Sequence, residues 1–172
     1  MIIDNAKLTD EGCNLIIQGI SKKALISLQL CGNEIGDTFL DSFNYSILWA
    51  QGSLLRQLNL NFCKISTNNI NLLFHYLQEG YQISLKYLGI AGLGIEEKNF
   101  QTIGTFLEGS QCQQLINLDI SHNNFDYETS LAFFKILAQN KYITTLNYSH
   151  NSLSNVDKDD ENEILNILGE IL

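Results

Sequence analysis

The sequence predicts an α/β fold, a curved solenoid with a parallel inner β-sheet and an outer layer of α-helices. Three observations support this prediction. A short apolar pattern recurs from Leu25, Leu55, Leu85, Leu115 and Ile143, so successive copies start 30, 30, 30 and 28 residues apart. Within each copy apolar residues alternate with polar ones, as in a strand, and beyond it they return at helical spacing. A period of this length is typical of chains that stack similar units side by side.

The strand and the turn after it can be followed in LINLDISHNNF, residues 115–125. Leu118 and Ile120 lie two positions apart, which predicts a short strand with both side chains facing the core. The chain must then turn inward, where peptide groups lose their partners on the neighbouring strand and an unpaired buried group is costly. The side-chain amide of Asn123 carries donors and an acceptor that can bond to these groups. With Leu93 as the exception, the stacked copies therefore predict a structural ladder of turn residues: Asn33, Cys63, Asn123 and Asn151.

The remainder of each copy predicts an α-helix. Counted from the last apolar residue of the pattern, apolar side chains return eight and twelve positions later, and a spacing of four lies on one face of a helix. In four successive copies these pairs are Phe43 and Ile47, Leu73 and Leu77, Ile103 and Leu107, and Phe133 and Leu137. One helix per copy would cover one face of the sheet.

The first residues predict a partial N-terminal unit. Leu8 takes the last apolar position of the pattern, and Ile16 and Ile20 follow at the helical spacing. Met1 and Ile3 then represent the strand of this unit. At 172 residues, the chain is expected to form a single repeat domain over residues 1–172. Its units would be about five full repeats and the partial one, starting near residues 1, 25, 55, 85, 115 and 143.

The pattern L-x-x-L-x-L-x-x-N/C-x-L, followed over nearly the whole chain, resembles that of the leucine-rich repeat family. A strand and a full helix within about 30 residues are similar to its ribonuclease-inhibitor-like subclass. The resemblance implies a non-catalytic protein–protein interaction or scaffold subunit of a larger intracellular assembly, in a cytoskeletal or ciliary setting. Repeat proteins usually bind their partners over an extended concave surface.

A GTPase-activating protein similar to the Ran GTPase regulator is the alternative function. That family shares this repeat subclass and is acidic at its C-terminal end. Activation of a GTPase would use a suitably placed arginine. The sequence contains one arginine, Arg56, which is expected just before a strand and towards one rim.

The concave face is expected to carry the side chains that flank the inward leucines of each strand. The predicted partner-binding residues are Gln29, Gln57, Asn59, Tyr87, Gly89, Asn117, Asp119 and Asn147. Tyr87 is the expected aromatic anchor, with a shallow pocket over Gly89. A simpler interpretation is that short neutral side chains keep like charges apart on a parallel sheet, without a direct role in binding.

The sequence predicts no catalytic, cofactor-binding or metal-binding residues. His122 and His150 take the same place in successive copies and should stack, but zinc needs three or four ligands. Asp119, Ser121 and His122 do not have the spacing of a catalytic triad, since a strand places Asp119 and Ser121 side by side on one face. The acidic run DKDDENE, residues 157–163, lacks the full ligand spacing and the central glycine of a calcium loop, and is interpreted as a solvated loop.

Composition argues against several function classes. The net charge of −9 disfavours nucleic acid, whose binding needs a basic stripe. The sequence has no apolar run long enough to span a membrane, and its first residues lack the pattern of a signal peptide. Cys13, Cys31, Cys63 and Cys112 form no C-x-x-C pair and are interpreted as reduced thiols of a cytoplasmic protein. The expected partners are therefore proteins, without nucleic acid, membrane, cofactor or small-molecule substrate.

Both ends of the solenoid are predicted to be unfinished. Terminal units need a polar outer face, whereas this sequence starts with Met1, Ile2 and Ile3 and ends with ILNILGEIL, residues 164–172. Exposed apolar surface of this kind usually marks a contact. We therefore expect a partner to cover one or both ends.

Overall fold

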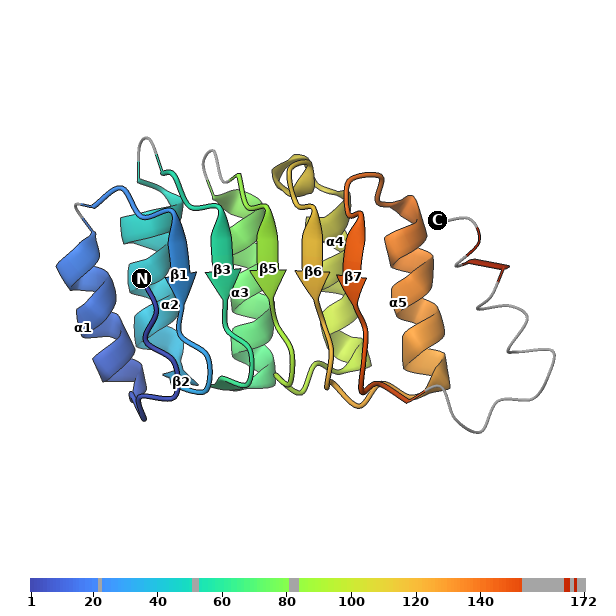
Figure 1. Ribbon diagram of the computed structural model, residues 1–172, viewed down its shortest axis with the longest axis horizontal. Coiled ribbons are helices and arrows are strands. Elements are labelled where there is room, and N and C mark those ends of the chain that lie inside the picture. The colour runs from blue at the N-terminus through green and yellow to red at the C-terminus, as the bar shows by residue number, and fades with distance from the viewer. Residues whose placement is uncertain (22, 51–52, 81–83, 153–165, 168, 170–172) are drawn as a thin grey trace.

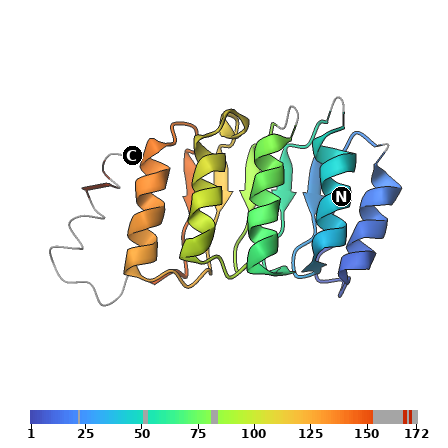
Figure 2. The same ribbon diagram turned by 180° about the vertical axis from the view of Figure 1, so that it is seen from behind.

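The chain folds as a mixed α/β protein in which a layer of strands lies against a layer of helices (Figure 1). The computed structural model describes residues 1–21, 23–50, 53–80, 84–152, 166–167 and 169. Five parallel strands form an open sheet in the order β1-β3-β5-β6-β7. These are β1 (Ser27–Gln29), β3 (Gln57–Asn59), β5 (Tyr87–Gly89), β6 (Asn117–Asp119) and β7 (Thr145–Asn147). The helices cover one face of this sheet, as the view from behind shows (Figure 2).

Each strand of this sheet pairs with the next at an offset of one sequence period. Leu28, Leu58, Leu88, Leu118 and Leu146 are neighbours across the sheet in that order. The first four are buried, with at most 2% of their surface exposed. The predicted parallel sheet is confirmed, because equal spacing places each position of one copy beside its equivalent in the next.

Helices follow β1, β3, β5 and β6, and another precedes the sheet. The α-helices are α1 (Asp10–Ile20), α2 (Asp37–Phe43), α3 (Thr67–Glu79), α4 (Phe100–Glu108) and α5 (Tyr127–Gln139). Short turns extend two of them, namely the π-helical η1 (Asn44–Leu48) after α2, and the 3₁₀ turns η2 (Glu97–Asn99) and η3 (Ser110–Cys112) around α4. A second parallel sheet joins β2 (Glu34–Ile35) to β4 (Lys64–Ile65). Among the described helices, none combines the length and apolar character that a membrane span requires.

The helical residues predicted to face the sheet are buried. All eight side chains of the four predicted pairs, from Phe43 to Leu137, are at most 4% exposed and belong to one core cluster with the strand leucines. The first helix differs from the prediction, because Cys13 and Ile17 are its buried residues whereas Ile16 and Ile20 are partly buried. As the first helix of its layer, α1 packs against α2 on one side.

Asn123 joins two successive turns through its side-chain amide. It accepts hydrogen bonds from the backbone N–H groups of Leu93 and Ile95, both at 3.1 Å, and donates to the carbonyls of Ile90 and Ile120 at 3.1 and 3.0 Å. The residue is only 5% exposed. Buried peptide groups of both turns therefore have partners that the strands do not supply.

Asn33 and Asn151 make bonds of the same kind. Each amide oxygen accepts from two backbone N–H groups, and each amide nitrogen donates to carbonyls of its own and the preceding turn. Cys63 has only a thiol, which donates to the carbonyl of Leu30 at 3.1 Å. Burial raises the pKa of this thiol to about 12, so it stays protonated and can donate. Leu93 is buried and brings no polar group to the ladder.

The N-terminus is attached to the sheet beside β1. The amino group of Met1 donates to the carbonyl of Ser27 at 2.6 Å, and the N–H of Ile3 donates to the carbonyl of Gln29 at 2.9 Å. Ile2 lies between them and remains 66% exposed. The predicted acidic loop and nearly all of the apolar C-terminal run lie outside the described residues. Coverage of the ends by a partner stays a prediction.

Asp10 caps the helix that follows in the next copy of the pattern. Its carboxylate accepts hydrogen bonds from the backbone N–H groups of Gly36 and Phe39 at 2.9 Å and of Thr38 at 3.0 Å. Gly36 leaves room for it, since a Cβ there would lie 2.7 Å from the Cγ of Asp10. Burial by itself would raise the pKa of Asp10, but these hydrogen bonds favour the charged form and leave the pKa below its ordinary value.

Substitution Asp10→Asn is expected to remove a pH-dependent part of the stability. Because the pKa of Asp10 is lowered in the folded chain, its carboxylate contributes stability above the ordinary pKa of 3.8, and this contribution is lost as the pH falls through the folded-state pKa. At about pH 7 the wild type should exceed the variant by roughly 0.5–2 kcal/mol in free energy of unfolding. The difference should shrink below about pH 4.

Denaturant melts at neutral and acidic pH measure this difference. Glu11→Gln is the matched control, since this exposed neighbour accepts no hydrogen bond from a described residue. If the control lost as much free energy of unfolding, with the same pH dependence, the capping role of Asp10 would be contradicted.

Candidate functional site

The face of the sheet that points away from the helices is covered by no described helix or strand, and is here termed the open face (Figure 1). The strand register aligns its side chains in rows. The first row is Ser27, Gln57, Tyr87, Asn117 and Thr145, and the middle row is Gln29, Asn59, Gly89, Asp119 and Asn147. Two positions after the end of each strand lies a third row of Cys31, Asn61, Ala91, Ser121 and Ser149. All eight predicted partner-binding residues lie in the first two rows.

Hydrogen bonds between side chains tie the middle row to the third row. Asp119 accepts from the amide of Asn61 at 2.9 Å through one carboxylate oxygen and from the hydroxyl of Ser121 at 2.7 Å through the other. Asn61 lies in the turn that follows β3, two strands away from β6, so its side chain reaches across the copy that contains β5. Asn147 donates to the hydroxyl of Ser121 at 3.4 Å and extends the network to β7. The network holds these side chains in place.

The predicted pocket over Gly89 is wrong, because Gly89 is buried. The side chains of Asn59 and Asn61 lie over it, and a Cβ at position 89 would be 2.5 Å and 2.8 Å from their respective Oδ1 atoms. The Oδ1 of Asn61 also accepts a hydrogen bond from the N–H of Ala91 at 2.8 Å. Gly89 thus makes room for the bond between Asn61 and Asp119 instead of receiving a side chain from a partner.

Two side chains of the first row take no part in the network. The side chains of Gln57 and Asn117 hydrogen-bond to none of the residues that the structure describes. Tyr87 stands between them on β5 and is half-buried. Burial and the charge of Asp119 raise the pKa of the Tyr87 phenol, against the opposing effect of a hydrogen bond with Asn61. The row therefore presents a neutral phenol between two amides.

The predicted site residues thus fall into two groups. Gln57, Tyr87 and Asn117 stand together in the first row, and Gln29 lies beside the N-terminal segment. The remaining four serve the network or make room for it: Asn59, Gly89, Asp119 and Asn147.

A row of rings lies at the edge where the strands end. His122 and His150 stack with ring centroids 3.9 Å apart, which confirms the predicted stacking, and Phe62 meets His122 edge to face at 5.2 Å. Gly92 lies between Phe62 and His122, and a Cβ there would be 2.4 Å from the Phe62 ring. Sequence reasoning missed Phe62. The available signal was its place one position before a ladder residue, the place that both histidines take.

The chemistry of this edge does not form a recognisable catalytic or metal centre. In the described parts of the chain, no three His, Cys, Asp or Glu side chains gather closely enough to hold a metal ion. The Ser121 hydroxyl bonds to Asp119, while His122 stacks on the next histidine, which is not the arrangement of a catalytic triad. At the opposite edge, just before β3, Arg56 is half-buried, and its guanidinium donates to the carbonyl of Leu55 at 3.4 Å.

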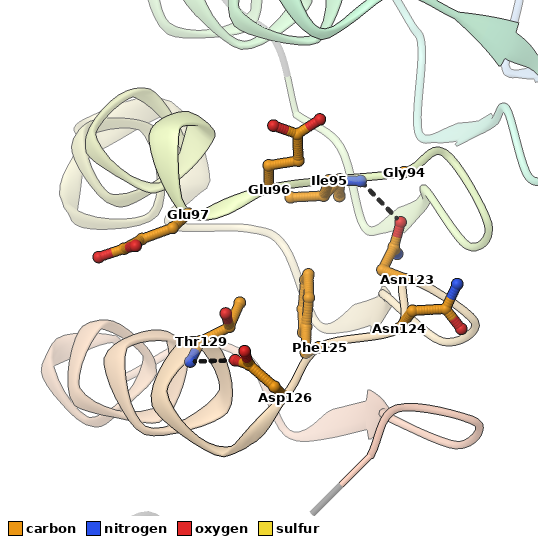
Figure 3. Close-up of a pocket in the computed structure, with 9 residues that line it drawn as sticks. All are labelled: Gly94, Ile95, Glu96, Glu97, Asn123, Asn124, Phe125, Asp126 and Thr129. Atoms are coloured by element: carbon orange, nitrogen blue, oxygen red, sulfur yellow. Dashed lines mark hydrogen bonds between the residues drawn. The ribbon is translucent and has the colours of Figure 1, made fainter.

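A cleft of about 310 Å³ lies between two turns where α4 and α5 begin (Figure 3). It is lined by Gly94, Ile95, Glu96, Glu97, Asn123, Asn124, Phe125, Asp126 and Thr129. Asp126 accepts from the backbone N–H of Thr129 at 2.9 Å, and Glu96 pairs with Lys98 at 2.7 Å. Hydrogen bonds with Thr129 lower the pKa of Asp126, and those with Lys98 lower the pKa of Glu96. Both carboxylates are therefore engaged in capping and pairing.

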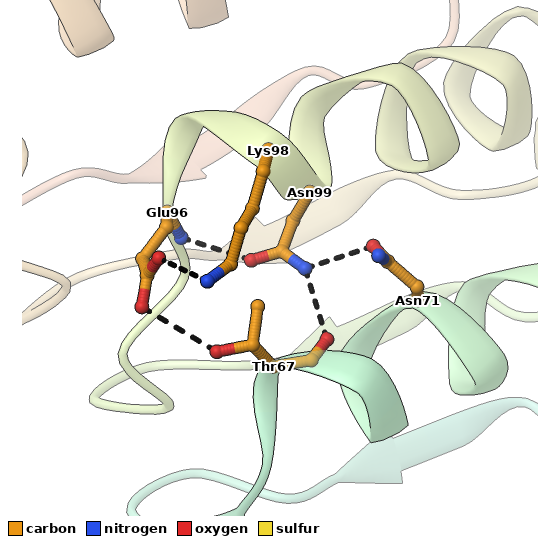
Figure 4. A network of polar contacts seen from close by, with 5 residues as sticks. All are labelled: Thr67, Asn71, Glu96, Lys98 and Asn99. Carbon is orange, nitrogen blue, oxygen red and sulfur yellow. Dashed lines mark hydrogen bonds and ion pairs between the residues drawn. The ribbon is translucent and has the colours of Figure 1, made fainter.

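Asn99 connects the start of α4 to α3 (Figure 4). Its oxygen accepts from the N–H of Glu96 at 3.0 Å, and its amide donates to the carbonyl of Thr67 at 3.1 Å and to Oδ1 of Asn71 at 2.8 Å. Asn99 is fully buried. Sequence reasoning missed it, because it lies beyond the recurring pattern, which ends at Ile95 in this copy. Its contacts indicate a structural residue.

Comparison with known proteins shows a likeness in fold. No protein-family model matches the chain, and no curated protein matches it in sequence. Among solved structures, it is similar to leiomodin-1 actin-binding site 2 (ABS2), with a TM-score of 0.60 and 18% sequence identity. The match covers 76% of this chain and 70% of that chain. At this level of identity the likeness shows a shared fold.

Proposed function

We propose that this chain is a leucine-rich repeat solenoid of the ribonuclease-inhibitor-like subclass and works as a non-catalytic protein-interaction module. The recurring pattern supports the repeat assignment, since its strands lie in register and its turn residues bond from one copy to the next. The fold shared with an actin-binding domain supports a cytoskeletal setting.

The observation that carries the proposal is the first row of the open face. Gln57, Tyr87 and Asn117 lie on adjacent strands, roughly 4.8 Å apart, with a fixed polar network beside them. Each amide can donate to and accept from a partner's backbone. Tyrosine is enriched among the residues that dominate binding energies, because its ring gives a large contact and its hydroxyl a hydrogen bond.

Actin is the first partner to test, because the similar leiomodin-1 domain is named as an actin-binding site. Wild-type chain should bind either actin filaments, measured by co-sedimentation, or fluorescently labelled actin monomers. The open-face variant combines Gln57→Ala, Tyr87→Ala and Asn117→Ala. Its affinity should fall by roughly tenfold or more, because the aromatic anchor and two hydrogen-bonding groups are removed together.

A matched control keeps the number and kind of substitutions but moves them to the helical side. Asn68→Ala, His75→Ala and Gln101→Ala remove two amides and one ring from exposed positions of α3 and α4. This variant should bind like wild type. Equal weakening in both variants would contradict the assignment of the open face, and absence of binding to both forms of actin would exclude actin as the partner.

A further inference from the structure

The edge at which the strands begin carries a second set of side chains that the open face does not use. Just before successive strands, Ile26, Arg56, Lys86 and Ile116 follow one another across the sheet. Backbone hydrogen bonds join them, from Arg56 to Ile26 at 2.8 Å, from Lys86 to Arg56 at 2.7 Å, and from Ile116 to Lys86 at 3.1 Å. These four residues are here termed the strand-start row, and they lie at the upper ends of the strands in Figure 1.

The row places two positive charges side by side. Neither Arg56 nor Lys86 forms a salt bridge with a residue that the structure describes. Their backbones lie roughly 4.8 Å apart on neighbouring strands, and like charges on residues opposite each other reduce stability. Lys23 and Lys141 lie in loops that lead to the same edge, although the protein as a whole has a net charge of −9. A carboxylate from outside this edge would relieve the repulsion.

The opposite edge, where the helices begin, is acidic. Asp10, Glu96 and Asp126 accept hydrogen bonds there from helix N-termini or neighbouring side chains, so their charges have local partners. Arg56 and Lys86 lie before strands and cap no helix. At the strand-start edge Lys23, Arg56, Lys86 and Lys141 outnumber Glu79 and Glu108, which end α3 and α4 there. An approaching acidic segment would therefore be oriented towards the strand-start row.

Apolar side chains flank the two charges. Ile26 is 58% exposed and Ile116 is 40% exposed. Leu54 and Tyr142, at the same edge, are 42% and 43% exposed. Exposed apolar side chains gathered around unpaired charges are typical of a contact surface.

We propose that the strand-start row binds an acidic amphipathic α-helix of a partner protein. Two carboxylates of that helix would pair with Arg56 and Lys86, and one apolar side chain would pack on each of Ile26 and Ile116. An α-helix advances about 5.4 Å per turn, close to the strand spacing of about 4.8 Å. A helix that crosses the strands therefore presents one residue per turn to each of them. The matching pattern is apolar, acidic, acidic and apolar at positions i, i+4, i+7 and i+11, which lie on one helical face.

A synthetic peptide tests the proposal without knowledge of the natural partner. It carries leucine at the two outer positions and glutamate at the two inner positions of that pattern, in a background of alanine and glutamine. Fluorescence anisotropy with the full chain should show binding that weakens as salt is added. A second peptide has lysine in place of glutamate. Its affinity for the chain should be lower by roughly tenfold or more.

Charge reversal in the protein keeps the test independent of any folding defect. The double variant Arg56→Glu and Lys86→Glu should no longer bind the glutamate peptide and should bind the lysine peptide instead. A misfolded chain would not acquire binding to the lysine peptide. Lys64→Ala removes a lysine from the opposite edge and is the control for Lys86→Ala. The affinity of the control for the glutamate peptide should stay within about twofold of wild type. The affinity of Lys86→Ala should be lower.

Three results would overturn the proposal. The first is equal affinity for the glutamate and lysine peptides, and the second is a double variant that does not reverse the preference. The third is binding to vesicles that contain phosphatidylserine without binding to the glutamate peptide, since the row would then be a membrane contact. None of these measurements depends on the open face or on actin.

Discussion

Replacing Asn123 by alanine should lower the free energy of unfolding by about 3 kcal/mol or more. The substitution removes the acceptor for the N–H groups of Leu93 and Ile95 and a donor to the carbonyl of Ile90. Each buried group left without a partner costs roughly 1–3 kcal/mol. The site is 5% exposed, so water has little access to replace these bonds. The carbonyl of Ile120 keeps a donor from the next asparagine at 3.1 Å and adds little to the loss.

The matched control is Asn124→Gly. Asn124 is exposed and has a φ of 55°, a conformation that glycine adopts without strain. The control should lose about 0.5 kcal/mol at most, as exposed substitutions usually do. Denaturant melts of both variants measure the difference. Equal losses would contradict a structural role for the amide at position 123.

Replacing Phe133 by alanine should lower the free energy of unfolding by about 3–5 kcal/mol. Phe133 is fully buried in an aromatic cluster on the inner side of α5. Its ring centroid lies 6.2 Å from those of Phe100 and Phe125, 5.7 Å from that of Phe134, and 5.8 Å from that of Tyr148. Truncation would leave a cavity, because the neighbouring rings also contact one another and cannot all move into the space.

Phe62→Ala makes the same chemical change at an exposed position. Phe62 is 54% exposed and has a φ of 58°, a conformation that is about equally unfavourable for alanine. The substitution removes the edge-to-face contact with His122 and should cost about 1 kcal/mol or less. If denaturant melts gave similar losses for both variants, the aromatic cluster around Phe133 would not be a tightly packed part of the core.

The sequence by itself determined which residues lie beside each other across the sheet. Leu58, Leu88 and Leu118 stand one period apart, and a parallel strand has room for one residue of each copy at each level. The same argument placed His122 against His150 and identified Asn123 as a turn residue. These features follow from spacing, because a repeated backbone conformation repeats the direction of every side chain.

Only the tertiary structure decided how individual polar side chains are used. Asn61 bonds to Asp119, 58 positions away, and this bond covers Gly89 where the sequence suggested a pocket. Asp10 caps α2 instead of its own helix. Spacing shows which face a side chain occupies, but not which rotamer it adopts or which distant group it reaches. Those choices depend on the three-dimensional positions of all neighbouring donors and acceptors, since each buried polar group must find a partner within hydrogen-bond distance.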